Sequence, residues 1–363
     1  MESKVVGEIE KRGHEQLAVF NYPRVGLKAI VAIHNTVLGP ALGGCRMRLY
    51  DDEGAAIEDA LRLAEGMTYK SSLAGLDLGG GKSVLVADPS MKQGRRELFL
   101  QFGRCLNHLD GRYITAEDMG TSVSDVMVMR EVSRFAAGFS PEQGGGGDPS
   151  PWTAKGVFNG IKAALTKKFG SADLSNRTVA VQGAGHVGIY LIEHLVNAGA
   201  KVIVSDTVEA RLQDAKRFGV TVVSPDAIYD QDCDVYAPSA IGQTVNANTV
   251  GRLKCSIIAG AANNVLIDSS MYEPLAKKGI LYCPDFAINS GGVISVGAEY
   301  NAGGWKEGWV AEKVERIGST IERILMEADK RGKATEVVAL ELAKERIAAA
   351  EEKSKTPVNS ARL

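Results

Sequence analysis

The stretch RTVAVQGAGHVGIYLIEHLVNAGAKVIVSD, residues 177–206, constrains the fold of this chain more than any other. Gly183, Gly185 and Gly188 form the pattern G-x-G-x-x-G between a strand-like run and a helical run. A glycine turn in this position aims the backbone N–H groups of the helix amino terminus at a phosphate. A second strand-like run then ends in Asp206. The unit predicts a Rossmann-type parallel sheet that binds a dinucleotide.

Asp206 lies 18 residues beyond Gly188, at a spacing typical of an acidic side chain that contacts the cofactor's ribose. Its charge would repel a 2′-phosphate, so the pattern favours NAD over NADP. The alternative is that Asp206 only caps the next helix. The residues expected to hold the cofactor here are Gly183, Ala184, Gly185, His186, Val187, Gly188 and Asp206. No histidine has a second ligand at a useful spacing, so we predict no metal site.

Length and segment order predict an α/β protein of two domains. The chain has 363 residues, enough for two domains of ordinary size. The run SPEQGGGGDPSPWT, residues 140–153, is typical of a boundary or hinge. We predict an N-terminal α/β domain, residues 1–140, joined by a C-terminal helix, residues 331–363. Residues 141–330 are expected to form the doubly wound NAD-binding domain.

Charge and composition exclude several classes of partner. The net charge of −2 argues against a nucleic-acid partner, which usually needs a basic surface. No apolar run approaches the roughly 18–20 residues of a membrane span, and the polar N-terminus lacks a signal peptide's apolar core. The five scattered cysteines fit reduced thiols, so we expect a cytoplasmic protein. The ending Ala361-Arg362-Leu363 resembles a peroxisomal address only loosely, and that question stays open.

The segment GLDLGGGKSV, residues 75–84, resembles a nucleotide phosphate loop but does not match it. The motif G-x-x-x-x-G-K-[ST] needs a glycine where this chain has Leu76. We expect a glycine loop here. Its Lys82 is then either a solvated surface lysine or a catalytic residue.

Two more charged residues lie near the ends of predicted elements in the N-terminal half. Residues 52–75 have the apolar spacing of a helix, and Lys70 lies near its end. Residues 111–118 are strand-like and end in Asp118. A nicotinamide-dependent enzyme needs a second site for its substrate, and these residues are candidates for it. Ordinary surface salt bridges are the alternative.

Sequence blocks along nearly the whole chain resemble the glutamate/leucine/phenylalanine/valine dehydrogenase family, and most closely its leucine-specific branch. They include AIHNTVLGPALGGCRM, LGGGKSV, GRYITAEDMGT, VQGAGHVG, IAGAANN and PDFAINSGGVISV, in the family's order. The resemblance implies NAD-dependent, reversible oxidative deamination of an L-amino acid to its 2-oxo acid and ammonia. It implies that Lys70 binds the substrate carboxylate and that Lys82 hydrogen-bonds the water or carbonyl oxygen at Cα. Asp118 would exchange protons with the amine.

The resemblance also implies further contacts and an assembly. The N-terminal domain would bind substrate and mediate formation of a homo-oligomer, often an octamer. Further cofactor contacts implied are Thr153, Ala240 and Asn263. Further substrate contacts implied are Gly43, Met67 and Asn263. A helix cap for Thr153 and a turn residue for Asn263 are the alternatives.

Substrate choice is expected to follow from an apolar pocket. The family's glutamate enzymes have GP-x-K-G-G where this chain has GPALGG, so Leu42 replaces their lysine, and Val296 replaces a serine. Ala116 and Val293 would complete the wall. An unpaired carboxylate there would cost several kcal/mol, whereas burying an aliphatic side chain gains roughly 2–3 kcal/mol. Leucine, isoleucine and valine are therefore predicted, with phenylalanine or tryptophan as the alternative and ordinary core roles for Leu42 and Val296 as another.

Three residues depart from the leucine-specific pattern. Cys45 replaces a usual threonine, Ser239 replaces a usual cysteine, and Gln243 is unusual. Because of these residues, the pocket shape and the cofactor contacts stay open questions. The predicted reaction does not depend on them. A non-catalytic NAD-sensing protein on the same fold is the remaining alternative, and the intact lysines and aspartate argue against it.

Overall fold

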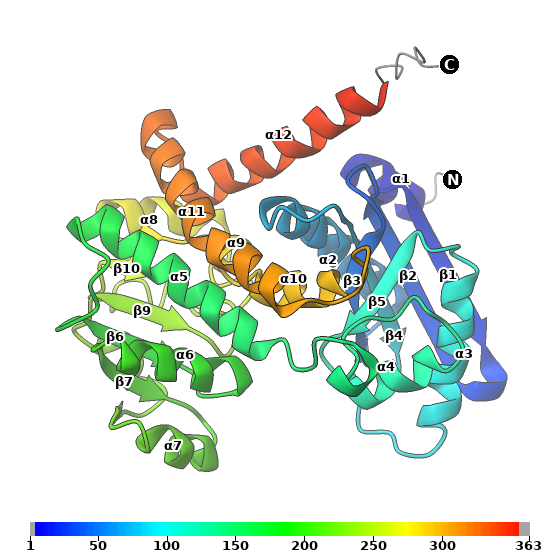
Figure 1. Ribbon diagram of the computed structural model, residues 1–363, viewed down its shortest axis with the longest axis horizontal. Coiled ribbons are helices and arrows are strands. Elements are labelled where there is room, and N and C mark those ends of the chain that lie inside the picture. The colour runs from blue at the N-terminus through cyan, green and yellow to red at the C-terminus, as the bar shows by residue number, and fades with distance from the viewer. Residues whose placement is uncertain (1–3, 356–363) are drawn as a thin grey trace. The chain divides into compact units, whose positions relative to one another are not determined.

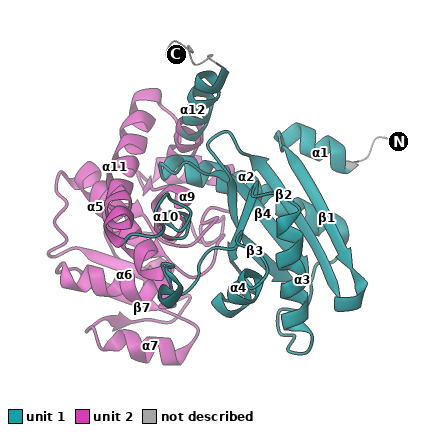
Figure 2. Ribbon diagram, turned by 45° about the vertical axis from the view of Figure 1, so that its right-hand side comes forward, with its two compact units in different colours: residues 1–148, 296–306, 343–363 teal, residues 149–295, 307–342 magenta. Residues whose placement is uncertain are grey.

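The computed structural model describes residues 4–355, which form two compact units (Figure 2). Of these residues, unit 1 comprises 4–148, 296–306 and 343–355, and unit 2 comprises 149–295 and 307–342. The break after Asp148 lies in the glycine- and proline-rich stretch. The functional domains 1–140 with 331–363, and 141–330, stay predictions, and Ala361-Arg362-Leu363 lies outside the described residues.

Unit 1 is built on a five-stranded mixed sheet, counted within residues 4–355, with the order β1-β2-β4-β3-β5 (Figure 1). β2 pairs antiparallel with β1 and β4, whereas β3 pairs parallel with β4 and β5. The strands are β1 (Gln16–Tyr22), β2 (Leu27–Asn35), β3 (Ala41–Arg48), β4 (Gly79–Val86) and β5 (Tyr113–Glu117). The helices are α1 (Lys4–Arg12), α2 (Glu53–Leu73), α3 (Arg95–Asn107) and α4 (Val123–Arg130).

Apolar layers cover both faces of this sheet. On one face, Phe102 of α3 and Met129 of α4 pack with residues of the strands. On the other face, Ala60, Leu61 and Ala64 of α2 pack against β2 and β4. The helical spacing predicted over residues 52–75 is confirmed, because the buried side chains of α2 recur on the face that meets the sheet.

The glycine loop predicted around Lys82 is wrong, because residues 79–86 form the buried strand β4. Its glycines allow backbones to approach one another too closely for side chains. A Cβ at Gly43 of β3 would overlap the carbonyl oxygen of Gly81, and a Cβ at Gly80 would overlap the backbone of Thr68 in α2. Tertiary contact therefore overrides the low strand propensity of glycine.

Unit 2 contains a six-stranded parallel sheet, again counted within residues 4–355, with the order β11-β10-β9-β6-β7-β8. Numbered within the unit and taken from the β8 edge, this is the 3-2-1-4-5-6 order of a Rossmann fold, so the predicted fold class is confirmed. The strands are β6 (Thr178–Gln182), β7 (Lys201–Ser205), β8 (Thr221–Val222), β9 (Val235–Pro238), β10 (Ile257–Ile258) and β11 (Leu281–Tyr282). The helices are α5 (Ser150–Phe169), α6 (His186–Asn197), α7 (Glu209–Lys216), α8 (Tyr272–Lys277), α9 (Asp285–Ile288) and α11 (Glu307–Arg331).

Two helices contribute residues to both units. They are α10 (Gly291–Ala298) and α12 (Thr335–Lys355). Within unit 2, α5 packs between α6 and α11. No helix within residues 4–355 combines the length and apolar character needed to cross a bilayer.

Substituting alanine for two glycines tests the close contact between α2 and β4. Gly80→Ala is expected to lower stability by about 3 kcal/mol, at the upper end of the usual cost of overpacking, because backbone atoms rather than a flexible side chain must move. Gly66→Ala is the matched control in α2, where a Cβ meets nothing within 4 Å. It should be neutral or stabilising by up to about 1 kcal/mol, because alanine favours helix. Thermal unfolding measures both, and equal unfolding temperatures would contradict the packing argument.

Candidate active site

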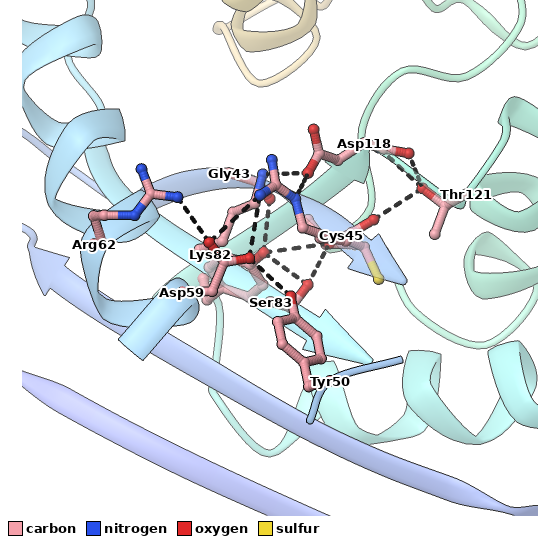
Figure 3. A network of polar contacts seen from close by, with 12 residues as sticks. Gly43, Cys45, Tyr50, Asp59, Arg62, Lys82, Ser83, Asp118 and Thr121 are labelled. Carbon is pink, nitrogen blue, oxygen red and sulfur yellow. Dashed lines mark hydrogen bonds and ion pairs between the residues drawn. The ribbon is translucent and has the colours of Figure 1, made fainter. Parts of the chain in front are cut away.

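A buried ion pair between Lys82 and Asp118 lies at the centre of the candidate site in unit 1 (Figure 3). Lys82 is in β4, Asp118 directly follows β5, and Lys82 Nζ is 2.8 Å from Asp118 Oδ2. Only 4% of Lys82 is exposed, so its charge needs a partner within the protein. The structure therefore brings together the two residues that the sequence predicts to be catalytic.

A second cation, Arg46 of β3, contacts the same carboxylate oxygen. Arg46 Nε donates a hydrogen bond of 2.9 Å to Asp118 Oδ2. Burial alone would raise the pKa of Asp118, but the charges and hydrogen bonds of Lys82 and Arg46 lower that pKa well below its usual range. Sequence reasoning missed Arg46. The available signal was a charged residue between Cys45 and Met47, two residues of β3 that are fully buried.

Arg46 is held in turn by α2. Its Nη1 donates a hydrogen bond of 3.1 Å to Asp59 Oδ2, and Asp59 also accepts hydrogen bonds from Tyr50 and Arg62, each of 2.8 Å. Burial opposes ionisation of Asp59, but these donors lower its pKa. Charges of alternating sign thus follow one another through the site, in the order Arg62, Asp59, Arg46, Asp118 and Lys82.

Gly44 allows the backbone of β3 to pack closely against the ion pair. A Cβ at this position would lie 2.7 Å from Asp118 Cβ and 3.3 Å from Lys82 Nζ. Gly44 is paired in register with Ala116 of β5, which is one of the predicted pocket residues. A side chain at position 44 would press on both charged groups, so only glycine keeps this approach open.

Lys70 and Met67 lie on α2 close to its contact with β4. The backbone of Thr68 abuts Gly80, and Lys70 is two residues beyond Thr68 along the helix. His34 Nδ1 is 2.8 Å from Thr68 Oγ1, which ties this turn to β2. Both Lys70 and Met67 are half-buried.

The glycine turn of unit 2 has the form that a dinucleotide phosphate needs. Gly183 has φ +104°, and its Cβ would lie 2.6 Å from the Cβ of Ala240 after β9. A Cβ at Gly188 would overlap the carbonyl oxygen of Gly183. Gly185 immediately precedes α6 and has open space around it. The turn therefore lies where the strand order reverses, between β6 and β9, and leads directly into the amino terminus of α6.

Asp206 directly follows β7, and its side chain holds this glycine turn in place. Its Oδ2 accepts a hydrogen bond of 2.8 Å from the N–H of Ala184, and its Oδ1 accepts one of 2.8 Å from Val208. Arg211 Nη1 is 3.7 Å from Oδ1. A surface hollow of about 530 Å³ begins at Asp206 and is lined further by Thr207, Leu212 and Val223. The residues present thus fit the adenosine half of a dinucleotide.

The comparisons with known proteins agree with this geometry. Residues 14–134 match the family model "Glu/Leu/Phe/Val dehydrogenase, dimerisation domain", and residues 144–216 and 204–354 match "Glutamate/Leucine/Phenylalanine/Valine dehydrogenase". The chain belongs to this family. Leucine dehydrogenase of Bacillus subtilis is 48% identical, over 93% of each chain, and that of Thermoactinomyces intermedius is 46% identical, over 95% of this chain and 93% of the other. The predicted family is therefore confirmed.

The structure of a more distant family member has the same fold. The crystal structure of L-tryptophan dehydrogenase from Nostoc punctiforme superposes with a TM-score of 0.84 at 39% identity, covering 96% of this chain and 99% of that one. The family uses a nicotinamide dinucleotide, NAD or NADP, in the oxidation of amino acids. This chain is accordingly an amino acid dehydrogenase.

The predicted pocket residues of this family member fall in both units. In unit 1, Leu42 is buried in β3, and a Cβ at Gly297 would lie 3.7 Å from its Cδ2. Val296 and Val293 are three residues apart on α10 and so share one face of that helix. Val293 belongs to unit 2 and Val296 to unit 1.

Asn263 and Thr153, both in unit 2, are held by neighbours within that unit. Asn289 Nδ2 donates a hydrogen bond of 2.7 Å to Asn263 Oδ1, and Thr153 Oγ1 donates one of 3.2 Å to the carbonyl of Pro149. Sequence reasoning missed Asn289, whose side chain also donates to the carbonyl of Ala261. An asparagine just before the GG pair in FAINSGG was the available signal.

The departures from the leucine-specific pattern have local explanations. Cys45 is fully buried in β3, where burial raises the pKa of its thiol to about 12. Ser239 Oγ donates a hydrogen bond of 3.3 Å to the carbonyl of Ala237. Gln243 has φ +58°, and its N–H donates to the carbonyl of Asn264. His186 is exposed, and residues 4–355 contain no cluster of three or more His, Cys, Asp or Glu side chains suited to a metal.

Two glycines of the turn should respond differently to alanine. Gly188→Ala is expected to lower both stability and NADH binding, since its Cβ would overlap protein backbone. Gly185→Ala should fold normally, because that Cβ has room and the φ of −71° suits alanine. It should nevertheless weaken NADH binding at least tenfold, since the methyl group occupies the approach of the pyrophosphate. Unfolding temperature and NADH fluorescence titration report the two effects, and unchanged affinity in Gly185→Ala would refute the assigned phosphate site.

Proposed function

We propose that this protein catalyses the reversible, NAD-dependent oxidative deamination of a branched-chain L-amino acid. Leucine is the main substrate and isoleucine and valine are also used. The observation that carries the proposal is the buried Lys82–Asp118 ion pair in a chain that is 45–48% identical to several leucine dehydrogenases. Such a pair can supply both a hydrogen-bond donor and a proton acceptor for the oxidation of an amine.

Each charged residue in unit 1 takes a distinct part in this proposal. Lys70 binds the α-carboxylate of the amino acid. Lys82 donates a hydrogen bond to the oxygen that develops at Cα, first as attacking water and finally as carbonyl. Asp118 binds the substrate ammonium group and exchanges protons with it. The burial of Lys82 supports these roles, because water competes poorly for a donor that is almost completely enclosed.

The reaction balances with one water and one bound cofactor. The chemistry that a bound nicotinamide supplies is the reversible acceptance of a hydride from Cα. Loss of hydride from the neutral amine leaves an iminium ion, and water adds to its carbon. Collapse of the adduct breaks the C–N bond and releases ammonia. The products are a 2-oxo acid, ammonium, NADH and one proton.

Asp206 supports the choice of NAD over NADP. Its side chain is only 4% exposed, and both oxygens already accept backbone N–H groups, so it cannot turn away from a 2′-phosphate. The negative charge would repel that phosphate at short range. The residues proposed to bind NAD are the six of the turn, 183–188, with Asp206, Thr153, Ala240 and Asn263.

Apolar side chains support an aliphatic substrate. Leu42, Ala116 and Val296 offer no partner for a distal carboxylate, and burying one without a partner costs several kcal/mol. Gly43, Met67, Asn263 and Val293 are the further proposed substrate contacts. An aromatic substrate is the second candidate, since phenylalanine dehydrogenase of Bacillus thermotolerans is 42% identical, over 93% of this chain and 89% of its own.

We also propose a cytoplasmic homo-oligomer, octameric by family resemblance. The matched N-terminal model is described as a dimerisation domain, and β1 pairs with β2 alone within residues 4–355. An unpaired strand edge is a ready surface for a second copy. The five cysteines are free and buried, which suits a reducing compartment. Residues 1–140 with 331–363 are proposed to bind substrate and assemble, and 141–330 to bind NAD.

An NADH absorbance screen across the L-amino acids tests the proposed function. Leucine, isoleucine and valine should reduce NAD at least tenfold faster than phenylalanine, and NADP should be a poor substitute. Lys82→Met should lower kcat by a factor of about 1000, which is typical of a lost catalytic donor, with unchanged NADH affinity. A fully active Lys82→Met variant would overturn the assigned chemistry. Binding of NADH without turnover of any amino acid would instead favour a sensor.

Truncating Leu42 tests the pocket against an ordinary core role. Leu42→Ala is expected to lower kcat/KM for leucine by about 10–100-fold relative to phenylalanine, since a lost apolar contact is worth about 1–3 kcal/mol in discrimination. Leu98→Ala is the matched control, because Leu98 of α3 is equally buried but packs in the core with α4. It should lower stability and leave the leucine/phenylalanine ratio unchanged. If the leucine/phenylalanine ratio of kcat/KM is the same in the two variants, Leu42 has only an ordinary core role.

A further inference from the structure

We propose that Arg46 is a positioning residue for the deamination, and that with Asp59 it aims one oxygen of Asp118, Oδ1, at the substrate amine. The inference rests on the proposed function and adds two residues to it. Arg46 and Asp59 do not touch substrate in this proposal. They act through the carboxylate of Asp118.

The two oxygens of Asp118 have different surroundings. Oδ2 is contacted by Lys82 Nζ at 2.8 Å and by Arg46 Nε at 2.9 Å. No hydrogen bond or ion pair joins Oδ1 to another described residue, and Figure 3 shows one carboxylate oxygen of Asp118 that carries no dashed contact. The side chain of Asp118 is 26% exposed, against 5% for Lys82. Oδ1 is therefore the oxygen that an incoming ammonium group can reach.

The backbone at Asp118 is fixed independently of its side chain. Its N–H donates a hydrogen bond of 2.9 Å to Thr121 Oγ1, and the Thr121 hydroxyl contacts the carbonyl of Cys45 at 2.9 Å. With the backbone tied to β3, the remaining freedom is rotation of the carboxylate. Two donors from different strands on one oxygen remove that freedom.

Asp59 keeps Arg46 from turning away. The guanidinium spans two carboxylates, with Nε on Asp118 and Nη1 on Asp59. Its side chain is 16% exposed and that of Asp59 is 13% exposed, so water competes weakly for either contact. A lysine could replace the charge but could not reach both carboxylates with a planar fork.

Arg46 contributes both a positive charge beside Asp118 and a fixed orientation of its carboxylate, and these two contributions have different consequences. The groups that contact Asp118 or its partners are Lys82 from β4, Arg46 from β3, and Asp59 and Arg62 from α2, with Tyr50 beyond β3. Removing the charge of Arg46 raises the pKa of Asp118, because a nearby cation favours the ionised carboxylate. A protonated Asp118 cannot accept a proton from the substrate ammonium group. Accepting it frees the amine for hydride loss, and the proton returns to the nitrogen as ammonia leaves.

The experiment compares Arg46→Gln, Arg46→Lys and Asp59→Asn with Arg48→Gln. Arg48 is the matched control, since it lies two residues along β3, is exposed and contacts neither carboxylate. The measurements are kcat and the pH profile of kcat/KM with leucine and NAD. Unfolding temperature and NADH affinity, which depends on residues of unit 2, check that each variant is folded.

Arg46→Gln should lower kcat about 100-fold, the usual scale of general acid–base catalysis, and move the acidic limb of kcat/KM upward by about one pH unit or more. Arg46→Lys should restore the limb but not kcat, because it returns charge without the fork. Asp59→Asn should lower kcat about tenfold, as expected for a supporting contact. Arg48→Gln should match the wild type.

Two results would overturn the inference. One is a folded Arg46→Gln variant with kcat within threefold of the wild type and an unmoved acidic limb. The other is full recovery of kcat in Arg46→Lys, which would leave Arg46 a charge without a positioning role. If Arg46→Gln does not fold, Arg46→Lys and Asp59→Asn decide the question. A wild type that oxidises no amino acid would refute the proposed function itself.

Discussion

The close approach of β3, β4 and α2 is the constraint on which the site depends. Three glycines make it possible: Gly43 faces the backbone of Gly81, and Gly80 faces that of Thr68. Such contact leaves no room for side chains or water between the elements. The backbone of Lys82 lies in this region without water, and its side chain is almost completely buried. Its ammonium group therefore needs an anion inside the protein. Asp118 meets that requirement, and its carboxylate also pairs with Arg46.

The alternation of charge suits an amino acid in particular. An amino acid is a zwitterion at neutral pH, so it brings one positive and one negative group into the site. In the proposed function, Lys70 would pair with the carboxylate, and Asp118 Oδ1, which the neighbouring cations do not contact, would pair with the ammonium group. Neither substrate charge is then left buried without a partner, which is the condition for binding charged groups away from water. The apolar side chains proposed for the pocket, Leu42, Ala116 and Val296, would then make the substrate side chain the part that is selected.

The sequence predicted the elements that local pattern determines and missed those that tertiary contact determines. The glycine turn before α6 and the apolar face of α2 were predicted because spacing alone specifies them. The sequence predicted a loop where the structure has the strand β4, because three successive glycines favour a turn. In the structure these glycines lie in a strand, since neighbouring backbones come too close for any side chain. Arg46 and Asp59 were missed for a related reason. In a sequence, an arginine in a strand and an aspartate on a helix look like solvated groups, and only the 3.1 Å contact between them shows that they interact.

Asp206 shows how one residue can satisfy two interpretations that the sequence presents as alternatives. A carboxylate that merely caps would bond the N–H of Val208 and face away from the turn, yet its other oxygen holds Ala184, inside the turn itself. Contacts within the protein therefore hold the turn in place. Ordering a loop on binding consumes part of the interaction energy, and a loop ordered in advance avoids that loss. In the proposed NAD site, the same buried charge that stabilises the loop would repel a 2′-phosphate, so loop order and cofactor choice would depend on one side chain. A change of cofactor preference made at this position alone must loosen the turn, which is why such a change needs a replacement for the Ala184 hydrogen bond as well as the removal of charge.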